Sequence, residues 1–388
     1  MRLGRLTATP PDMDKRLRVL FVPTTNAGVT YWRMLNYAAA AHRLGLGDLH
    51  LLWWQKDLTE AHPWENEIRD PQYCWRVTRE LQEWALQSDA IVIQMLHTND
   101  GMALLEALRD MLPNTPILAE IDDHMTSTAE YNPAADYYRP GSELRRIAVE
   151  QFTKSDGIVV STPYLKEVYS EFNKNIWVIP NAIDLQKWGR LRRRSRPGIR
   201  IGWAGGASHE DDLAIVKDIV PRILDKFPDV TFVFVNGIPA WAKKLPAERV
   251  ELVRKWTRID HYPAMLAGLG LDIGIAPLVD NAFNRGKSNL RWLEYSALGI
   301  PCVASNVGHF AETIVHGEDG FLADDAEGFY TYISDVIANR KLRCAMGAKA
   351  ADRIRRDFTT DVVTPYYISC LREAIAKKQQ ESPAEVMQ

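Results

Sequence analysis

Residues 287–305 read Lys287-Ser-Asn-Leu-Arg-Trp-Leu-Glu294-Tyr-Ser-Ala-Leu-Gly-Ile-Pro-Cys-Val-Ala-Ser305, and their spacing predicts a helix followed by a buried parallel strand. Ser288 and Asn289 can cap the start of this helix, where backbone N–H groups lack partners. Gly299 is expected to end it. The apolar side chains at helical spacing, which we expect to face a core, are Leu290, Leu293, Ala297 and Leu298.

Three charged side chains are predicted to share the other side of the same helix. Lys287, Arg291 and Glu294 are spaced i, i+4 and i+7. Two cations near a helix N-terminus favour a phosphate, and a carboxylate about 10 Å further along the axis suits sugar hydroxyls. The pattern therefore predicts a site for a nucleotide diphosphate, with a solvent-exposed ion pair as the alternative.

Short apolar runs alternate with helical patterns along the chain and predict parallel βαβ units. The expected strands of the first half are residues 17–23, 49–54, 90–94, 116–121, 157–161 and 176–180. Those of the second half are residues 198–203, 230–235, 272–277 and 302–305. Residues 211–226 read as one helix and residues 250–255 as a short connection.

The length of 388 residues predicts two domains. Residues 190–200 contain six arginines beside Pro and Gly, a composition that resists packing and predicts a linker. A nucleic-acid contact is the alternative, although no aromatic residues interleave the arginines. The expected division is a first domain over residues 1–189, the linker over 190–200, a second domain over 201–356, a helix over 357–380 and a disordered tail over 381–388.

The composition is that of an ordinary globular protein, with 46% hydrophobic and 25% charged residues. A formal net charge of −3 gives no general reason to expect nucleic-acid binding. The four cysteines lack metal-ligand spacing and indicate reduced thiols. No apolar run is long enough for a membrane span, and the N-terminus lacks the apolar core of a signal peptide. We therefore expect a cytoplasmic protein.

Two further loops follow predicted strands of the second half, at the end where ligands bind in open α/β sheets. Gly205 and Gly206 stand between a strand and a helix, where a phosphate can approach the backbone. Asn281 and Asn284 lead into Lys287 and could hydrogen-bond sugar hydroxyls. A plain tight turn at the glycines and Asx turns at the asparagines are the alternatives.

Two overlapping motifs resemble a known enzyme family. Residues 283–295 follow Phe-Asn-x-x-Lys-Ser-x-Leu-Arg-x-x-Glu-Tyr, and residues 294–301 read Glu-Tyr-Ser-Ala-Leu-Gly-Ile-Pro. Both resemble the nucleotide-sugar helix of the family-four-like retaining glycosyltransferases, or glycosyl transferases group 1. The resemblance implies the α/β fold called GT-B, in which two Rossmann-like domains with parallel sheets face each other across a cleft and the last helix crosses back to the first domain.

The resemblance also implies roles for residues that spacing alone would not single out. In the family, the segment matching Arg258 and Ile259 borders the base of the nucleotide, and the loop of Gly205 and Gly206 lies against the donor phosphates. Ser288, Asn289, Arg291 and Glu294 fall in the donor-binding motif with Lys287. In the first half, Asp122 and His124 match the family's reactive centre, and Gly28 matches a loop that touches the acceptor or a phosphate. His97 is a further candidate for the cleft, with a purely structural role as the alternative.

The predicted function is therefore glycosyl transfer from a nucleotide sugar, such as a UDP- or GDP-sugar, with retention and without a metal or other cofactor. The acceptor stays open among a glycan, a lipid carrier, a protein and a modified nucleobase. Gly286 stands where the family usually has a first Glu that helps to hold the donor sugar. That departure leaves a non-catalytic nucleotide-sugar-binding protein as one alternative, and an epimerase or hydrolase on the same fold is another.

Overall fold

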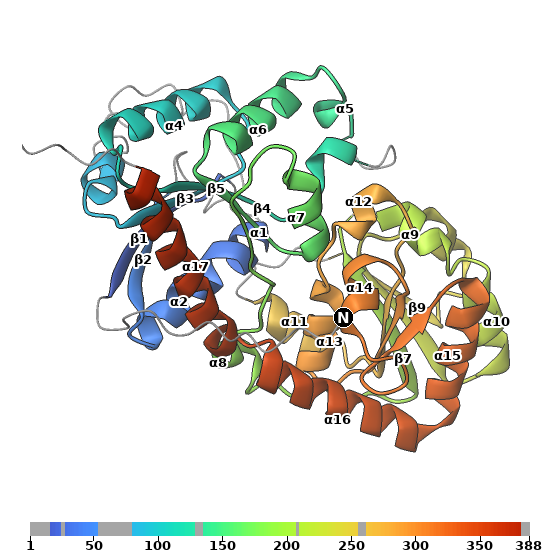
Figure 1. Ribbon diagram of the computed structural model, residues 1–388. Coiled ribbons are helices and arrows are strands. Elements are labelled where there is room, and N and C mark those ends of the chain that lie inside the picture. Colours follow the sequence, from blue (N-terminus) through green and yellow to red (C-terminus); the bar gives the residue numbers. More distant parts are fainter. Residues whose placement is uncertain are drawn as a thin grey trace, which may run out of the picture. The chain divides into compact units, whose positions relative to one another are not determined.

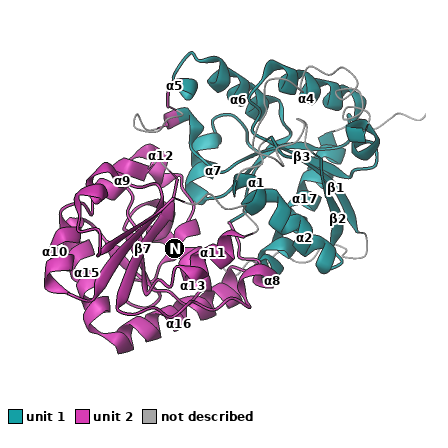
Figure 2. Cartoon of the chain, turned by 180° about the vertical axis from the view of Figure 1, so that it is seen from behind, with its two compact units in different colours: residues 1–126, 137–180, 360–388 teal, residues 127–136, 181–359 magenta. Residues whose placement is uncertain are grey.

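The structure, a computed structural model, describes residues 16–24, 28–52, 80–128, 135–206, 209–254 and 261–381 (Figure 1). The chain divides into two compact units, coloured separately in Figure 2. Unit 1 consists of residues 1–126, 137–180 and 360–388, and unit 2 of residues 127–136 and 181–359. Apart from the short stretch 127–136, the chain passes into unit 2 at Asn181, where the sequence predicted a boundary at residue 189, and returns to unit 1 at Thr360. The predicted tail lies outside the described residues after Glu381.

Unit 1 is built on a six-stranded sheet in the order β2-β1-β3-β4-β5-β6. Every pairing in it is parallel, as βαβ alternation predicted. Its strands are β1 Leu17–Val22, β2 Gly47–Leu51, β3 Ala90–Gln94, β4 Ile117–Ile121, β5 Gly157–Val160 and β6 Ile176–Val178. All six fall where the sequence predicted strands, because buried parallel strands are short runs of mostly apolar residues.

Several helices of unit 1 follow the carboxyl ends of these strands and start at a threonine or serine cap. Thr98 and Thr162, for example, accept a hydrogen bond from the backbone N–H three residues later. In the last helix, the ring of Tyr367 stacks on Phe21 and meets the ring of Tyr37 edge to face, so this helix packs within unit 1. The described helices are α1 Gly28–Thr30, a π-helical turn Tyr31–Leu35, α2 Asn36–Arg43, α4 Asn99–Met111, α5 Ala135–Tyr138, α6 Glu143–Lys154, α7 Pro163–Tyr169 and α17 Thr360–Glu381.

Unit 2 contains a second parallel sheet, in the order β12-β11-β10-β7-β8-β9. Its strands are β7 Ile199–Gly205, β8 Val230–Asn236, β9 Val250–Val253, β10 Ile273–Ala276, β11 Cys302–Ser305 and β12 Phe321–Ala323. The reading of residues 250–255 as a connection was wrong, because Val250–Val253 forms the edge strand β9. Half of β9 is exposed, so it lacks the continuous apolar run that marks a buried strand.

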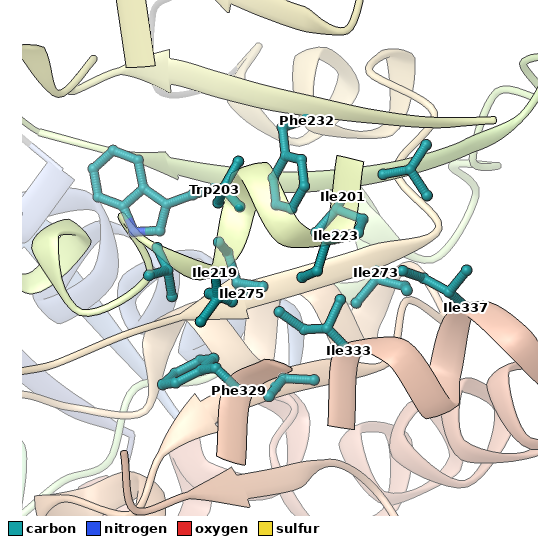
Figure 3. Packing of buried hydrophobic residues seen from close by; sticks show 14 of the residues in the cluster. Ile201, Trp203, Ile219, Ile223, Phe232, Ile273, Ile275, Phe329, Ile333 and Ile337 are labelled. Carbon is teal, nitrogen blue, oxygen red and sulfur yellow. The ribbon is translucent and has the colours of Figure 1, made fainter. Parts of the chain in front are cut away.

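Helices cover both faces of this sheet (Figure 1), and Figure 3 shows the packing of one face, where Trp203, Phe232 and Ile275 meet Ile223 and Phe329. The helix predicted over residues 211–226 is two helices joined by a turn. The helices are α8 Leu185–Trp188, α9 Glu210–Ala214, α10 Ile219–Lys226, α11 Tyr262–Gly268, α12 Ala282–Arg285, α13 Leu290–Ala297, α14 Gly308–Thr313, α15 Ala326–Ala338 and α16 Arg340–Asp357. Two α/β units with parallel sheets confirm the predicted fold class.

Residues 192–198 of the arginine-rich segment are exposed, yet the segment makes defined contacts with unit 2. Arg193 forms an ion pair with Asp272, and the backbone N–H of Arg194 donates to the carbonyl oxygen of Ala267 at 3.0 Å. Arg200, already in β7, is paired with Glu251 at 2.5 Å. These two ion pairs offset part of the mutual repulsion of the arginines. The role of the segment as a linker stays a prediction.

Candidate functional site

The helix predicted from the opening motif is present as α13 and is buried on more sides than expected. Leu293 is fully buried and the other three predicted core residues are half-buried, while Trp292 and Tyr295 are also fully buried. Gly299 ends the helix with a φ of +68°, as predicted. The Tyr295 hydroxyl lies 3.3 Å from the carbonyl oxygen of Gly202, which fixes α13 against β7.

The predicted caps of this helix were wrong, because tertiary contacts use both side chains. Ser288 accepts a hydrogen bond at 2.8 Å from the amide of Asn181. Asn289 occupies the cap position but makes no side-chain cap bond. It is fully buried, and its amide donates to the hydroxyl of Thr313 at 3.3 Å. The donor-binding role predicted for both residues stays a prediction.

Glu294 and Arg291 are not a solvent-exposed ion pair. The Glu294 side chain is 2% exposed and the Arg291 side chain 22%. One carboxylate oxygen of Glu294 accepts from the Tyr262 hydroxyl at 3.0 Å and from the Arg291 guanidinium at 3.3 Å. Burial raises the pKa of Glu294, and the charge of Arg291 opposes that rise. The structure therefore rules out the alternative of a solvated face for this pair.

Lys287 lies outside α13, which begins only at Leu290. The three charged residues therefore do not share one stripe of a single helix, as the spacing had predicted. The Lys287 ammonium is instead placed over the ring of Phe283 in α12, 4.3 Å from the ring centroid. It is half-exposed and enters the candidate site from the turn between α12 and α13.

The Arg291 guanidinium lies directly against the backbone at the carboxyl end of β7. A Cβ atom added to Gly205 would lie 2.4 Å from Nη2 of Arg291 and 2.6 Å from the ring of Trp203. The guanidinium carbon is 5.6 Å from the centroid of that ring. A side chain at residue 205 would therefore have to displace the Arg291 guanidinium or the Trp203 ring. Gly206, also a donor candidate, follows at the end of the strand.

A buried carboxylate that the sequence analysis did not single out organises the loops beside this cation. One oxygen of Asp212 accepts from the backbone N–H of Val279 and from the amide of Asn284, both at 2.8 Å. The other oxygen lies 2.8 Å from Nδ1 of His209. Asp212 is fully buried, so it fixes the start of α9 to the loop after β10. The candidate site thus rests on a preformed polar network.

Asn281 and Asn284 shape the same loop. The Asn281 side chain caps α12 by accepting from the backbone N–H of Asn284 at 2.8 Å. Asn284 is 1% exposed, and its amide also donates to the carbonyl oxygen of Val279 at 2.9 Å. Both residues therefore take part in the Asx-type contacts that the sequence analysis gave as the alternative. A direct contact with sugar hydroxyls stays a prediction.

His209 and Asp212 lie at the start of α9, and the sequence analysis singled out neither of them. No sequence pattern identifies Asp212, because its partners come from a loop 67 and 72 residues away. Burial, together with the charges of Arg291 and Lys287, lowers the pKa of His209 and favours the neutral imidazole.

The candidate residues of unit 1 follow the carboxyl ends of neighbouring strands, which form one edge of its sheet. Gly28 follows β1, His97 follows β3, and Asp122 and His124 follow β4. These strands are neighbours in the parallel sheet, so their carboxyl ends lie together. That edge is where open α/β sheets bind ligands. Their predicted roles, catalytic for Asp122 and His124, stay predictions.

Both histidines of this group are held by neighbouring side chains. His124 is 7% exposed, and its Nδ1 lies 3.3 Å from the Thr126 hydroxyl. Nδ1 of His97 lies 3.1 Å from the Tyr138 hydroxyl. Burial lowers the pKa of both imidazoles, which favours the neutral form. A neutral imidazole can accept a proton, as a general base must.

A buried ion pair beneath this edge was not predicted. Glu120, in β4, and Arg33, in the π-helical turn, are both buried and lie 2.6 Å apart. Arg33 also donates to the carbonyl oxygen of Ile179 at 2.6 Å. Burial raises the pKa of Glu120, and the charge of Arg33 opposes that rise. The pair fixes the π-helical turn after Gly28 to the centre of the sheet. Such turns are frequent at functional sites.

Arg258 and Ile259, the candidates for contact with the base, lie outside the described residues. Within the described part of the chain, no cluster of three or more His, Cys, Asp or Glu side chains is placed to hold a metal ion. No described helix combines the length and apolarity needed to cross a membrane. Metal-independent chemistry stays a prediction.

Comparison with known proteins relates part of the second half of the chain to an enzyme family. Residues 198–339 match the family model described as glycosyl transferases group 1. The GDP-mannose-dependent alpha-(1-6)-phosphatidylinositol monomannoside mannosyltransferase of Mycolicibacterium smegmatis is 31% identical over 117 residues, 30% of this chain and 26% of that protein. Glycogen synthase of Mycobacterium tuberculosis is 23% identical over 206 residues, 51% of this chain and 49% of that enzyme. The matches therefore span about a quarter to a half of these relatives.

Solved structures share the fold over nearly the whole chain. Anabaena Alr3699/HepE in complex with UDP superposes with a TM-score of 0.61 at 13% identity, covering 92% of this chain and 100% of that one. Sucrose-phosphate synthase from Thermosynechococcus elongatus also gives a TM-score of 0.61, at 14% identity, covering 93% and 100%. At these identities the likeness shows the fold alone.

Proposed function

Because residues 198–339 carry a domain of the glycosyl transferases group 1 on a chain with the GT-B fold, we propose that this protein transfers a sugar from a nucleotide-sugar donor to an acceptor. The bond between the anomeric carbon and the diphosphate oxygen breaks, and a bond from that carbon to an acceptor oxygen forms. The acceptor proton passes to the leaving diphosphate, and attack on the same face retains the anomeric configuration.

The observation that carries this proposal is the contact between Arg291 and the backbone at Gly205. It places a guanidinium at the carboxyl end of β7, and Lys287 adds an ammonium from the turn before α13. A departing diphosphate develops negative charge, and fixed cations at that point lower the barrier to its departure. These two residues give the site a means of stabilising the leaving group without a metal ion.

Glu294 is the proposed partner of the nucleotide ribose. One oxygen of its buried carboxylate accepts hydrogen bonds from both Tyr262 and Arg291, so the orientation of the carboxylate is fixed before a ligand arrives. A carboxylate accepts hydrogen bonds from vicinal hydroxyls, and such charge-assisted bonds are stronger than neutral ones. Asp212 supports the same site by fixing the loop that leads to Lys287.

The relatives favour a UDP- or GDP-sugar as donor. Alr3699/HepE has been solved with UDP and with UDP-glucose, and the mycobacterial relative is named as GDP-mannose-dependent. Asp122 and His124 are the proposed reactive residues of unit 1, with Gly28 and His97 beside them at the same sheet edge. His124, neutral and buried, is suited to accept a hydrogen bond from the acceptor hydroxyl and orient it, while the proton itself passes to the leaving diphosphate.

A donor screen tests the proposal. The full chain is incubated with UDP-glucose, UDP-N-acetylglucosamine, GDP-mannose and their free nucleotides, first in a thermal-shift assay and then with labelled sugar and an acceptor panel. A nucleotide that binds only the folded protein raises the melting temperature. Transfer of label to an acceptor supports the proposal. Donor breakdown without transfer, binding without turnover, or no shift with any nucleotide each contradicts it.

A further inference from the structure

Unit 1 contains a pocket that shares no residue with the candidate donor or reactive site. Its volume is about 580 Å³, within the range of small-molecule sites. It lies where the edge strand β6, helix α7 and the C-terminal half of α17 meet. The lining includes four cationic side chains, Lys166, Lys174, Arg372 and Lys377, and one anionic side chain, Glu373.

The single carboxylate of this pocket is already engaged. One oxygen of Glu373 accepts from the indole N–H of Trp177 at 3.1 Å, and the other lies 2.9 Å from the ammonium of Lys377. Lys166 and Lys174 are exposed, and neither forms an ion pair with any described carboxylate. The pocket therefore keeps an excess of positive charge after its internal pairing is complete.

Partial burial favours the neutral form of Glu373, yet hydrogen bonds from Lys377 and Trp177, with the charges of Lys377 and Lys166, lower its pKa. Its own partners thus keep this carboxylate charged. The positive charge left for an anionic ligand is that of the exposed Lys166 and Lys174 side chains.

The remaining lining suits a sugar ring. Tyr366 is half-buried and contributes aromatic surface to the wall, whereas Trp177 is 6% exposed and its ring lies 5.3 Å from the Lys377 ammonium. Ser369 adds a hydroxyl for hydrogen bonding. A bare phosphate would leave most of this volume and the aromatic surface unused. A saccharide that carries one anionic group would use both.

We propose that this pocket binds an anionic carbohydrate, with its phosphate or carboxylate held by Lys166, Lys174 and Arg372 and its ring packed on Tyr366. Such a ligand could come from a free sugar phosphate or from the charged end of a larger glycan. The site is independent of the proposed transfer reaction, because none of its lining residues belongs to the donor or reactive candidates. Its binding can therefore be measured without a nucleotide sugar.

The test is isothermal titration calorimetry on the full chain with glucose 1-phosphate, mannose 6-phosphate, glucuronic acid and a heparin-derived disaccharide. Glucose and sodium phosphate serve as the neutral and the ion controls. We expect at least one anionic sugar to bind more tightly than phosphate, and its affinity to fall as salt rises. The concentrations extend to about 10 mM, which reveals a dissociation constant in the millimolar range.

Two kinds of variant locate the binding. Lys166→Glu with Lys174→Glu reverses two exposed charges, and we expect affinity to fall at least about tenfold. Ala376→Phe fills the exposed α17 wall of the pocket while all charges stay, and should cause a similar loss. The matched control reverses two exposed lysines of unit 2, Lys217→Glu with Lys341→Glu, and should bind like the wild type.

Several results would overturn the assignment. One is that none of the sugars binds in this range. A second is that phosphate binds as tightly as the sugars, which means an adventitious ion only. A third is that the unit 2 control loses as much affinity as the pocket variants. A fourth is that vesicles of anionic phospholipid bind at the pocket while the sugars do not, which assigns the surface to a membrane. UDP titrations of the same variants show whether the proposed donor site is intact.

Discussion

Replacing Glu294 by Gln separates the two functions of this side chain, which are holding α13 in place and accepting hydrogen bonds from the donor. Glu294→Gln keeps an oxygen that can accept from Tyr262, and it keeps the volume of the side chain. It removes the charge that faces Arg291, 3.3 Å away. Glu294→Ala would remove everything at once and is the poorer test, because losing one partner of a buried pair costs about 3–5 kcal/mol in stability.

The expected loss of stability for Glu294→Gln is smaller than that. A hydrogen bond to a charged group contributes about 1.5–3 kcal/mol, but Arg291 is 22% exposed and recovers part of this from water. Burial also makes the ionised carboxylate costly, as its raised pKa shows, and the amide removes that cost. We expect a net loss of about 1–2 kcal/mol, or about 2–8 °C in melting temperature for a unit of this size.

Donor binding should respond more strongly. If Glu294 accepts hydrogen bonds from ribose hydroxyls, loss of its charge removes about 1.5–3 kcal/mol, and the dissociation constant for UDP or GDP rises by about 10–100-fold. Thermal unfolding and nucleotide titration are measured on the same preparation. Glu327→Gln, which breaks an exposed ion pair with Arg222 in the same unit, serves as the control and should change neither quantity by much. Wild-type nucleotide affinity in Glu294→Gln would refute the assigned role.

Three further predictions follow from the same site. Gly205→Ala should raise the dissociation constant for the nucleotide at least about tenfold, because the added Cβ displaces the Arg291 guanidinium. Calorimetric titration measures this constant, and unchanged affinity would contradict the prediction. Asp212→Ala should cost about 2–4 kcal/mol in urea unfolding and speed hydrogen exchange at the Val279 amide; protection equal to that of the wild type would exclude the anchoring role. Because burial lowers the pKa of His209, the stabilisation from its neutral imidazole should be lost as pH falls below about 6.5. His209→Gln should therefore reduce the dependence of the free energy of unfolding on pH, measured by unfolding curves across pH. An unaltered pH dependence would argue against this role.

The fold was largely readable from the sequence because its central strands are buried on both faces. Runs such as Ala90–Gln94 are almost entirely apolar, so they can be predicted as strands without knowing which strand lies beside them. The edge strand Val250–Val253 was not predicted, because only one side of it is covered and its sequence therefore resembles that of a loop. In the segment 190–200, the sequence could not predict the ion pair of Arg193, because its partner Asp272 lies far along the chain.

The candidate site was predictable where its residues are close in sequence. Arg291 and Glu294 are neighbours on one helix, and helical spacing alone places them together. Ser288 and Asn289 were given the wrong local role, because a cap depends on which tertiary partner competes for the side chain. Spacing along one segment contains no information about such partners.

Asp212 has consequences for how the site can work. The loop after β10 contains one short helix, α12, and is also held by a hydrogen bond from the Leu278 N–H to the Ser305 hydroxyl. Loops in general open at a lower cost in free energy than core strands. A buried carboxylate that accepts from two points of that loop fixes the approach to Lys287 before any ligand binds. A cation positioned in advance stabilises a leaving diphosphate without a cost for reorganisation. Loosening this anchor should therefore lower the rate of transfer more than it weakens nucleotide binding, since Arg291 and Glu294 are held from α13 and do not depend on the loop.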